Sequence, residues 1–379
     1  MDEAAATFSF VNAPLIGRPG SRARLVTPAL ILNLDAFERN LERMARLARA
    51  AGCGLRPHAK AHKSGEVARA QVAAGAIGAS CATMQEAEVM GAAGVPSVLV
   101  TSPVVGPPAI DRLLRLHGDT GELIVVVDHA DNARAIDAAA QGATVSVLID
   151  VNVGQNRTGV AGEAEVLALA QVIRDCTHLR LRGIQAYYGT LQHLPAYADR
   201  KAATTEPRVA IRGIVAALKA AGHETGIVSG GGTGTHHIDM ADGVFTELQV
   251  GSYAFLDSQY DGVALHPDDP HPFEDSLFVQ GTVVSDNQPG IVVVDCGWKA
   301  FATEGKAPQP LDGRTGFRFM GDEHCGLPRE AEGLATLALG DTVIFRPPHC
   351  DPTVNLFSAF QCVRDDTLEA IWPIEARGY

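Results

Sequence analysis

Short runs of apolar residues alternate with alanine-rich, amphipathic segments from residue 54 to about residue 250. The apolar runs are continuous, which is typical of strands that are buried on both faces of a parallel sheet. There are eight of them, and the polar motifs follow their C-terminal ends, so a (β/α)8 barrel is favoured over an open, doubly wound sheet. The predicted strands lie near residues 54–58, 77–81, 97–101, 123–128, 145–150, 182–187, 225–229 and 246–250.

The pattern changes beyond about residue 260, where short apolar stretches are separated by turn residues and show little helical periodicity. This change predicts a β-rich C-terminal domain. One further strand, at residues 29–34, precedes a helix over residues 35–51, and we expect that strand to join the β-rich domain. The predicted C-terminal strands are residues 277–284, 291–295, 342–345 and 368–372, and the predicted domains are residues 1–34 (N-terminal segment and strand), 35–256 (barrel) and 257–379 (β-rich domain).

The chain of 379 residues has a formal net charge of −13, a pI near 5.4 and no long basic run. Nucleic acid and anionic membrane surfaces are therefore poor candidate partners. The seven cysteines are scattered and form no C-x-x-C pair, as expected for reduced thiols. No stretch of about 18 apolar residues is present, and the N-terminus, with Asp2 and Glu3, lacks the basic and apolar segments of a signal peptide. The composition thus predicts a soluble, cytoplasmic protein.

A basic run, Arg56 to Lys63 (R-P-H-A-K-A-H-K), begins where the first predicted barrel strand meets a loop. A lysine amine that lies beside other cationic groups loses its proton readily, and the neutral amine can form an imine with a carbonyl cofactor. Lys60 is therefore a candidate Schiff-base lysine. A solvated basic edge of the barrel is the alternative interpretation.

A glycine-rich segment, Ser229 to Gly234 (S-G-G-G-T-G), follows the seventh predicted barrel strand directly. Glycines let backbone amides approach an anion closely, and the Ser and Thr hydroxyls add hydrogen-bond donors. Late strands of barrels often carry phosphate sites. The position of the segment thus favours phosphate binding over the alternative, a tight flexible loop.

Two further segments carry polar side chains at strand ends. Gly154 to Gly159 (G-Q-N-R-T-G) follows the fifth predicted strand, and its Arg157 can hydrogen-bond an anionic phenolate or carboxylate. After the sixth predicted strand, Tyr187 can stack near a ring or contact a phosphate, and His193 can act as a base near neutral pH. A turn-stabilising arginine, a core tyrosine and a surface histidine are the structural alternatives.

In the predicted β-rich domain, His349 and Asp351 are separated by a single residue. If this segment is extended, residues i and i+2 face the same side, so the imidazole and the carboxylate converge while Cys350 points away. Such a pair can hold a divalent cation, and the hard carboxylate oxygen favours Mn²⁺ or Mg²⁺. A hydrogen-bonded His–Asp pair without metal is the alternative.

Taken together, these residues resemble the D-threonine aldolase and D-serine dehydratase group of enzymes, which use pyridoxal 5′-phosphate (PLP) and have a barrel of the alanine racemase type. The likeness runs from about residue 26 to the end of the chain, and several motifs in the same order are more specific than any single one. The matching segments are R-P-H-x-K-x-H-K at 56–63, G-Q-x-R-x-G-V at 154–160, Q-A-Y…Q-H at 185–193, S-G-G-G-T-G at 229–234, E-L-Q-V-G-S-Y-A-F-L-D at 247–257, D-E-H at 322–324 and H-C-D-P-T at 349–353.

The resemblance implies roles for individual residues. Lys60 would form the Schiff base with the cofactor, Arg157 would meet its phenolic oxygen, and His193 would deprotonate the substrate hydroxyl. His349 and Asp351 would hold the metal ion. The resemblance also implies an active site between the barrel and the β-rich domain, completed across a homodimer. Further cofactor contacts are expected from His58, Tyr187, Ser229, Gly231, Gly232, Thr233, Gly234 and Tyr253.

The metal motif also bears on the reaction. The dehydratase branch carries His-x-Cys with zinc, a strong Lewis acid that helps hydroxide leave, whereas this chain has His349-x-Asp351. Asp351 therefore favours an aldolase that cleaves the Cα–Cβ bond of a small D-3-hydroxy amino acid, D-threonine or 3-hydroxy-D-aspartate, and gives glycine and an aldehyde. The alternatives are a D-serine or 3-hydroxy-D-aspartate dehydratase that releases ammonia and a 2-oxo acid, a racemase on the same barrel, and a PLP carrier protein. Phe357, Ser358 and Cys325 depart from the family pattern near the metal motif, and they bear on the identity of the substrate.

Overall fold

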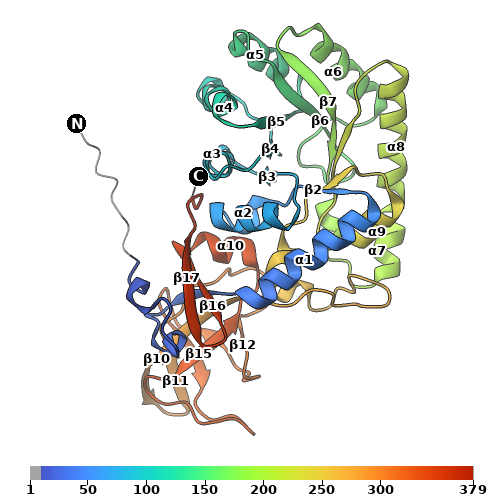
Figure 1. Ribbon diagram of the computed structural model, residues 1–379. Coiled ribbons are helices and arrows are strands. Elements are labelled where there is room, and N and C mark those ends of the chain that lie inside the picture. The colour runs from blue at the N-terminus through green and yellow to red at the C-terminus, as the bar shows by residue number, and fades with distance from the viewer. Residues whose placement is uncertain (1–9, 379) are drawn as a thin grey trace, which may run out of the picture. The chain divides into compact units, whose positions relative to one another are not determined.

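The computed structural model describes residues 10–378, and the chain folds into two compact units (Figure 1). The barrel unit comprises residues 39–254 and 260–273, and the β unit comprises residues 10–38, 255–259 and 274–377. Residues 1–9, on which the prediction about a signal peptide rests, lie outside the described residues. In the part of the chain that is described, no helix is both long and apolar enough to cross a membrane.

The barrel unit is built on eight parallel strands whose order in the sheet is β2-β9-β8-β7-β6-β5-β4-β3. The two ends of this ladder meet, because Ser80 N donates to the Pro57 carbonyl oxygen at 2.9 Å and His58 forms a parallel bridge with Ser80. The predicted eight-stranded parallel barrel is therefore confirmed. The strands are β2 (Gly54–Leu55), β3 (Ala79–Cys81), β4 (Ser97–Val100), β5 (Glu122–Val127), β6 (Val145–Val151), β7 (Leu179–Ala186), β8 (Ile227–Gly230) and β9 (Glu247–Leu248).

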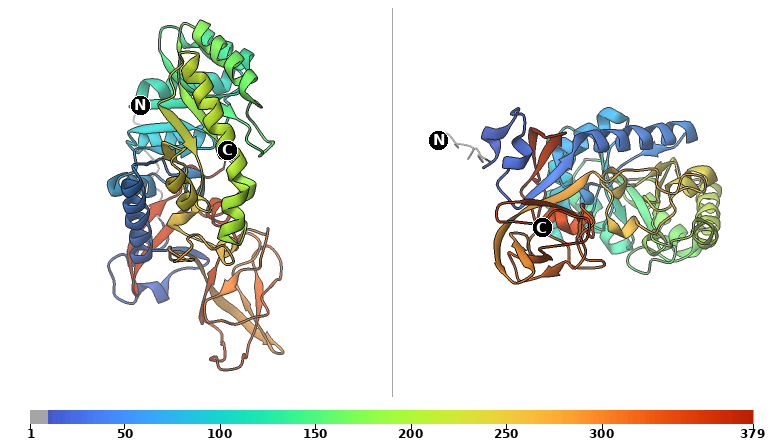
Figure 2. Two further views of the ribbon diagram at one scale, coloured as in Figure 1. Left: turned by 90° about the vertical axis from the view of Figure 1, so that its right-hand side faces the viewer. Right: turned by 90° about the horizontal axis from the view of Figure 1, so that it is seen from below.

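Helices connect the strands and lie on the outer face of this sheet (Figures 1 and 2). They turn an apolar stripe toward the strands; in α4, Ile110, Leu113 and Leu116 are buried at a spacing of three residues. Sequence signals set the helix starts, since Pro107 opens α4 and the side chain of Thr83 caps α3. The helices are α1 (Leu34–Ala51), which begins in the β unit, α2 (Gly65–Ala74), α3 (Met84–Ala92), α4 (Pro107–Asp119), α5 (Ala130–Ala140), α6 (Glu163–Asp175), α7 (Tyr197–Ala203), α8 (Thr205–Ala220) and α9 (His236–Asp242).

Apolar side chains fill the barrel. Leu99, Ile124, Val126 and Leu148 form one cluster and have no exposed surface. Val125, which points to the opposite face of β5, is equally buried. Burial on both faces explains why these strands read as continuous apolar runs rather than as an alternation of apolar and polar residues.

The β unit holds a mostly antiparallel sheet with the order β13-β14-β11-β10-β1-β16-β17, and β15 and β12 pair beside β10. The N-terminal strand β1 lies between β10, to which it is antiparallel, and β16, to which it is parallel. The sequence pattern does not predict β12, β13, β14 or β16, because the first two have only two residues, β14 contains Gly and Pro, and a buried Gln361 interrupts the apolar residues of β16. The strands are β1 (Ala29–Asn33), β10 (Leu277–Gln288), β11 (Ile291–Val294), β12 (Gln309–Pro310), β13 (Arg318–Phe319), β14 (Cys325–Pro328), β15 (Thr342–Arg346), β16 (Ala359–Arg364) and β17 (Thr367–Pro373).

A charged network lies at the N-terminal ends of the barrel strands, where β4, β5 and β9 begin with Ser97, Glu122 and Glu247. Arg56, which is 2% exposed, donates to both carboxylate oxygens of Glu247, at 2.7 and 3.0 Å. It also donates to the Ser97 hydroxyl at 2.7 Å, and that hydroxyl donates to Glu122 at 2.6 Å. Arg182 donates to the other oxygen of Glu122 at 3.0 Å. The network links the starts of these strands. Each buried charge in it depends on its partner, because removing one partner leaves the other without a counter-charge.

Replacing Glu247 by Gln should therefore lower the free energy of unfolding by about 3 kcal/mol, since the buried Arg56 guanidinium loses its counter-charge. The matched control is Asp131→Asn, which breaks an exposed pair with Arg134 and should change the free energy by less than about 0.5 kcal/mol. Urea denaturation followed by circular dichroism measures both values. Equal losses in the two variants would show that the network does not stabilise the barrel.

Candidate active site

Lys60 lies just beyond the C-terminal end of β2. The chain first continues the strand ladder, with His58 N donating to the Val250 carbonyl oxygen at 3.0 Å. It then forms a single 3-10 turn, η3 (Ala59–Ala61), which His58 caps by accepting from Lys60 N at 3.3 Å. His58 is buried, and its Nε2 lies 3.3 Å from the hydroxyl of Thr101, directly after β4. Neighbouring strand ends thus fix the backbone that carries Lys60.

Lys63, the other lysine of the basic run, is engaged in a buried ion pair. Its Nζ donates to Glu86 Oε1 at 2.8 Å, and Glu86 Oε2 accepts from Ala82 N at 2.7 Å. The Lys63 backbone has a φ of +54°, a left-handed conformation that residues other than glycine rarely adopt. Using this amine in catalysis would leave the Glu86 carboxylate buried and unpaired. The ion pair therefore makes Lys63 the poorer candidate of the two lysines in the run.

The glycine-rich segment links β8 to α9, and its glycines are required by close packing. A Cβ at Gly230 would lie 2.0 Å from the Ala186 carbonyl oxygen, and a Cβ at Gly234 would lie 1.9 Å from the Gln192 carbonyl oxygen. Gly231 has a φ of +64°, where other residues are strained. The segment is therefore a fixed part of the barrel edge and not a loosely held loop.

Thr233 and Tyr253, two of the predicted cofactor contacts, are adjacent. Thr233 Oγ1 accepts a hydrogen bond from Tyr253 N at 3.0 Å. Burial raises the pKa of the Tyr253 phenol, so its hydroxyl stays protonated, and Gln71 Nε2 donates to it at 3.5 Å. A Cβ at Gly251 would lie 3.5 Å from the Cβ of His58. The glycine-rich segment, the chain after β9 and the chain after β2 are thus neighbours at one edge of the barrel.

A chain of buried polar side chains crosses the barrel interior close to this edge. Asp150 Oδ1 accepts from Gln185 Nε2 at 2.9 Å, and Gln249 Nε2 donates to Gln185 Oε1 at 3.1 Å and to Ser229 Oγ at 3.0 Å. Burial raises the pKa of the Asp150 carboxyl above its ordinary value. The Ser229 hydroxyl, predicted as a phosphate donor, is fully buried and takes part in this interior chain.

Arg157 and Tyr187, predicted on separate segments, lie together. The guanidinium carbon of Arg157 is 5.9 Å from the centre of the Tyr187 ring, within the range of a cation–π contact. Asn152 shapes the loop that carries Arg157, because its Oδ1 accepts from Gly154 N at 3.1 Å and from Asn156 N at 3.0 Å. The pair presents an exposed cation, supported by an aromatic face, that can bind an anionic oxygen.

His193 lies on the segment after β7, two residues beyond a short 3-10 helix, η4 (Gly189–Leu191). Its ring centre is 4.8 Å from that of Tyr260, and the two ring planes are inclined by 50°. The side chain is exposed, so the imidazole can exchange protons with a substrate. The residue before it, Gln192, is buried and hydrogen-bonded to Thr235 at 3.1 Å.

The β unit carries His349 and Asp351 at the start of a short helix, α10 (Cys350–Asn355). The condition of an extended segment does not hold beyond His349, because His349 occupies the N-cap position, without a side-chain capping hydrogen bond, and Asp351 lies in the first turn of the helix, where an acidic residue is favoured by the helix dipole. The two side chains still converge, with His349 Nε2 4.0 Å from Asp351 Oδ2. That separation is too long for a hydrogen bond and within the span of two ligands that each lie about 2.1 Å from one cation.

Two further carboxylates surround this pair. Glu304 Oε1 lies 2.7 Å from His349 Nδ1, and Asp257 Oδ2 accepts from Cys350 N at 2.8 Å. Burial raises the pKa of Asp257 above its ordinary value. Across residues 10–378, no group of three or more His, Cys, Asp or Glu side chains has the geometry of a metal site. A cation held by His349 and Asp351 would therefore need water or substrate as further ligands.

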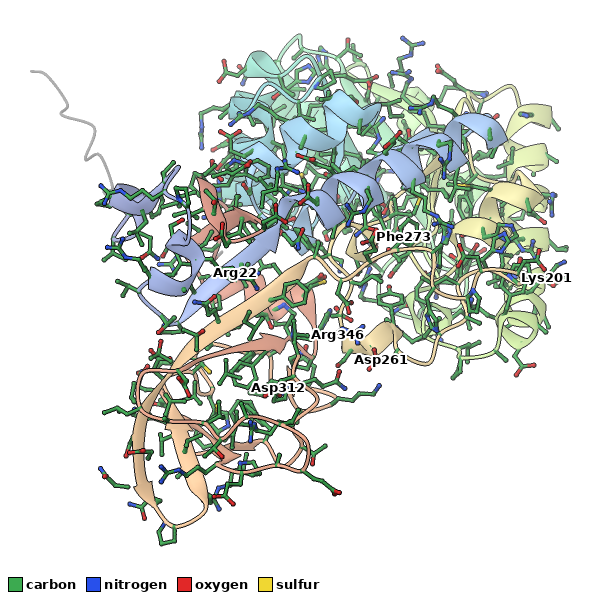
Figure 3. All side chains as sticks on the ribbon, turned by 60° about the horizontal axis from the view of Figure 1, so that its bottom comes forward. Arg22, Lys201, Asp261, Phe273, Asp312 and Arg346 are labelled. Atoms are coloured by element: carbon green, nitrogen blue, oxygen red, sulfur yellow. The ribbon has the colours of Figure 1, made fainter. Side chains whose placement is uncertain are left out.

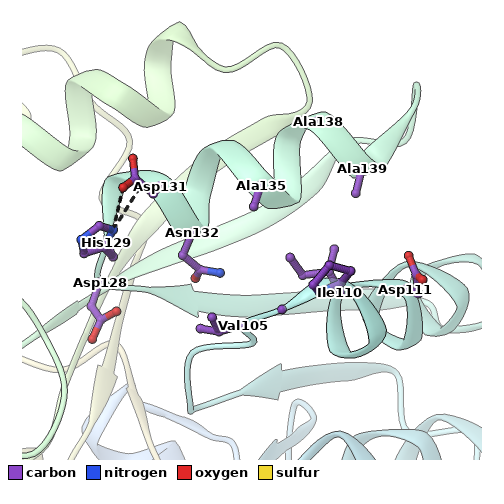
Figure 4. Close-up of a pocket in the computed structure, with 12 residues that line it drawn as sticks. Val105, Ile110, Asp111, Asp128, His129, Asp131, Asn132, Ala135, Ala138 and Ala139 are labelled. Atoms are coloured by element: carbon purple, nitrogen blue, oxygen red, sulfur yellow. Dashed lines mark hydrogen bonds and ion pairs between the residues drawn. The ribbon is translucent and has the colours of Figure 1, made fainter.

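A separate groove of about 620 Å³ lies between α4 and α5 (Figure 4). Val105, Ile110 and the alanines of α5 form its walls, with Asp128 and His129 at one end. None of the predicted site residues lines it. Asp128 accepts from Gly159 N at 3.0 Å, so the groove reaches only the rim of the loop after β6.

Three residues that the sequence motifs do not include hold the candidate side chains in place: Thr101 contacts His58, Glu86 pairs with Lys63, and Glu304 contacts His349. Thr101 could have been found as the first polar residue after an apolar run, and Glu86 as the last residue of the helix-capping pattern T-x-x-E. Glu304 has no signal in the sequence.

The protein families that this chain matches are consistent with the observed fold. Residues 32–259 match the family model of the alanine racemase N-terminal domain, and residues 276–363 match that of a putative serine dehydratase domain. The chain is 39% identical to a D-threonine aldolase from Arthrobacter sp, with 97% of each chain covered. It is 36% identical to a 3-hydroxy-D-aspartate aldolase from Paracoccus denitrificans (strain Pd 1222), with 95% of this chain and 94% of the relative covered.

Among solved structures, the D-threonine aldolase from Filomicrobium marinum superposes with a TM-score of 0.88 and 39% identity, over 94% of this chain and 96% of the other. Both the sequence and the fold are thus shared along almost the whole length. The chain therefore belongs to the family with an alanine-racemase-type barrel that includes the D-threonine and 3-hydroxy-D-aspartate aldolases.

Proposed function

We propose that this protein is a carbon–carbon lyase that depends on PLP and a divalent metal and cleaves D-threonine or 3-hydroxy-D-aspartate into glycine and an aldehyde. The reactions named for the similar aldolases support this proposal. The observation that carries it is that Lys60, the glycine-rich segment and the Arg157–Tyr187 pair all follow the C-terminal ends of strands of one barrel, which supports an amine, an anion site and a cation at the same edge.

The donor set of the barrel edge fits PLP. Arg200 is fully buried, donates to the Gly234 carbonyl oxygen at 2.7 Å, and has no carboxylate partner within the described residues. A buried cation without a counter-charge, directly behind a glycine-rich segment, favours an anionic group at that segment. Lys60 supplies an amine for the aldehyde of PLP, and Arg157 supplies a cation for its phenolic oxygen.

When bound, PLP supplies an electron sink for the pair that is released as the substrate's Cα–Cβ bond breaks. Lys60 holds the cofactor through its Nζ, and Arg157 orients the ring. His193 takes the proton from the β-hydroxyl of the substrate. The oxygen of that hydroxyl becomes the carbonyl oxygen of the aldehyde. Burial raises the pKa of the Tyr253 phenol, so Tyr253 is not a candidate base.

His349 and Asp351 would hold the cation, Mn²⁺ or Mg²⁺, through Nε2 and a carboxylate oxygen. Glu304 at His349 Nδ1 fixes the tautomer in which Nε2 can accept a metal. The ion would orient the β-hydroxyl of the substrate and make it more acidic.

A dehydratase acting on D-serine or 3-hydroxy-D-aspartate is the second candidate, because the segment with this pair matches a putative serine dehydratase domain. The carboxylate of Asp351, in place of a thiolate, favours the aldolase.

A homodimer that completes the active site and a cytoplasmic location belong to the proposal as well. All seven cysteines are free thiols, which supports a reducing compartment. The small D-3-hydroxy amino acid is the expected partner of the site.

The decisive experiment is a product assay on the purified holoenzyme with D-threonine and with 3-hydroxy-D-aspartate, each with Mn²⁺ and with EDTA. We expect glycine and an aldehyde with Mn²⁺ and little product with EDTA, because the metal assists loss of the hydroxyl proton. The ratio of the two rates identifies the preferred substrate. Ammonia and a 2-oxo acid would show instead that the protein is a dehydratase.

Replacing Lys60 by Ala should abolish the visible absorbance of the bound cofactor and the cleavage activity, because the covalent link through Nζ is lost. Lys63→Arg is the matched control and should retain the absorbance, because arginine keeps a positive charge opposite the buried Glu86 carboxylate. Absorption spectra of the two purified variants give the answer. Loss of the band in the Lys63 variant alone would mean that the lysine has been assigned wrongly.

Replacing Glu304 by Gln should weaken Mn²⁺ binding roughly 10- to 100-fold, because an outer partner that orients a metal-binding histidine is changed. Asp351→Ala should abolish binding and make the residual activity insensitive to Mn²⁺. Isothermal titration with Mn²⁺ measures the affinity without reference to turnover, and Glu330→Gln, an exposed position, serves as the control. Wild-type affinity in Asp351→Ala would remove that residue from the site.

A further inference from the structure

The residue that precedes His193 is anchored in the glycine-rich segment. Gln192 is 3% exposed, its Nε2 donates to Thr235 Oγ1 at 3.1 Å, and its Oε1 accepts from Thr235 N at 3.2 Å. Thr235 Oγ1 also accepts from Gly232 N at 3.3 Å. The amide of one glutamine thus contacts both the backbone N–H and the hydroxyl of Thr235, one residue before His193 in the chain.

The residue after His193 is tied to the same segment. The buried guanidinium of Arg200 donates to the carbonyl oxygen of Leu194 and, at 2.7 Å, to that of Gly234. On the other side of η4, the Tyr188 hydroxyl donates to Asp239, whose second oxygen accepts from Thr235 Oγ1 at 2.6 Å. The segment that carries His193 is therefore fixed on both sides to one short stretch of chain.

The two segments are also packed without space between them. A Cβ at Gly232 would lie 2.6 Å from Gln192 Oε1, and a Cβ at Gly234 would lie 1.9 Å from the Gln192 carbonyl oxygen. Close-packed groups transmit displacement, because neither can move without moving the other. A shift of the glycine-rich segment must therefore shift the backbone next to His193.

We propose that Gln192 is a positioning residue that ties His193 to the glycine-rich segment, so that the backbone which receives the cofactor's phosphate also sets the place of the base. The proposal rests on the proposed function. Gln192 acts through Thr235 and through its peptide bond to His193, and its side chain has no part in the proton transfer. A displacement of about 1 Å in a positioned group can lower turnover about 100-fold, so a contact of this kind has a measurable effect.

A double-mutant cycle on the holoenzyme tests the proposal, with Gln192→Met, His193→Gln and the double variant. Gln192→Met should lower kcat roughly 10- to 100-fold, and His193→Gln roughly 100- to 10,000-fold. In the His193→Gln background, Gln192→Met should lower kcat by less than about twofold, because no base is left to be misplaced. The same loss in both backgrounds, or wild-type kcat in Gln192→Met, would overturn the proposal.

The link to the glycine-rich segment has its own measurement. Gln192→Met should raise the Kd for PLP several-fold, because Thr235 N loses its acceptor and the Thr235 hydroxyl, which accepts from Gly232 N, loses the amide that holds it. A Kd equal to that of the wild type would remove the segment from the proposal. Gln171→Met, on the exposed side of α6, is the matched control and should leave both kcat and Kd unchanged.

A second variant and a measurement on the wild type complete the experiment. Thr235→Val removes the hydroxyl that Gln192 contacts, together with its bonds to Gly232 N and Asp239. Its effect on kcat should likewise depend on His193, so it replaces Gln192→Met if that variant does not fold. Wild-type release of glycine is measured first. If the wild type releases none, the proposed function fails, and the Kd comparison still decides whether Gln192 holds the cofactor segment.

Discussion

The backbone ladder that keeps eight strands parallel is the interaction on which the rest of this structure depends. Because all of the strands run the same way, residues as distant in the chain as Lys60 and Tyr253 arrive at the same edge of the barrel. The strand starts meet at the other edge, where Arg56 and Glu247 neutralise each other out of contact with water. One edge of the barrel thus carries a buried charge network, and the other carries the polar side chains of the candidate site.

The glycine-rich segment meets two demands with the same residues. Packing against the β7 side excludes a Cβ at Gly230 and Gly234, whereas an anion requires exposed backbone amides. The buried Arg200 connects the two demands, since it fastens the segment through a carbonyl oxygen and adds an uncompensated positive charge behind it. The side chains near the segment are held in turn, among them Phe273 (labelled in Figure 3), whose ring lies 5.9 Å from that of Tyr253 and 5.4 Å from that of His236.

The barrel could be predicted from the sequence because strands that are buried on both faces give continuous apolar runs. Thr83, whose side chain caps α3, likewise marks a helix start in the sequence. The convergence of His349 and Asp351 was predicted from an extended backbone, but a helix start produces it instead, and local spacing does not distinguish the two. Contacts between residues that are distant in the chain could not be predicted from the sequence. Glu304 is 45 residues from His349, and Gln192 is 43 residues from Thr235, so only the folded chain reveals those pairs.

The tight fit between Gly234 and the Gln192 carbonyl oxygen matters for any attempt to change this protein by directed evolution. A library that randomises Gly230 and Gly234 would consist mainly of chains that cannot fold, because a single added carbon at either position overlaps with a backbone oxygen. Thr190 is exposed and can be exchanged, whereas a Cβ at Gly159 or at Gly189 would lie 2.6 Å from a neighbouring atom. Variation at exposed turn positions such as Thr190 would explore new substrates while the glycine-rich segment serves as an invariant scaffold.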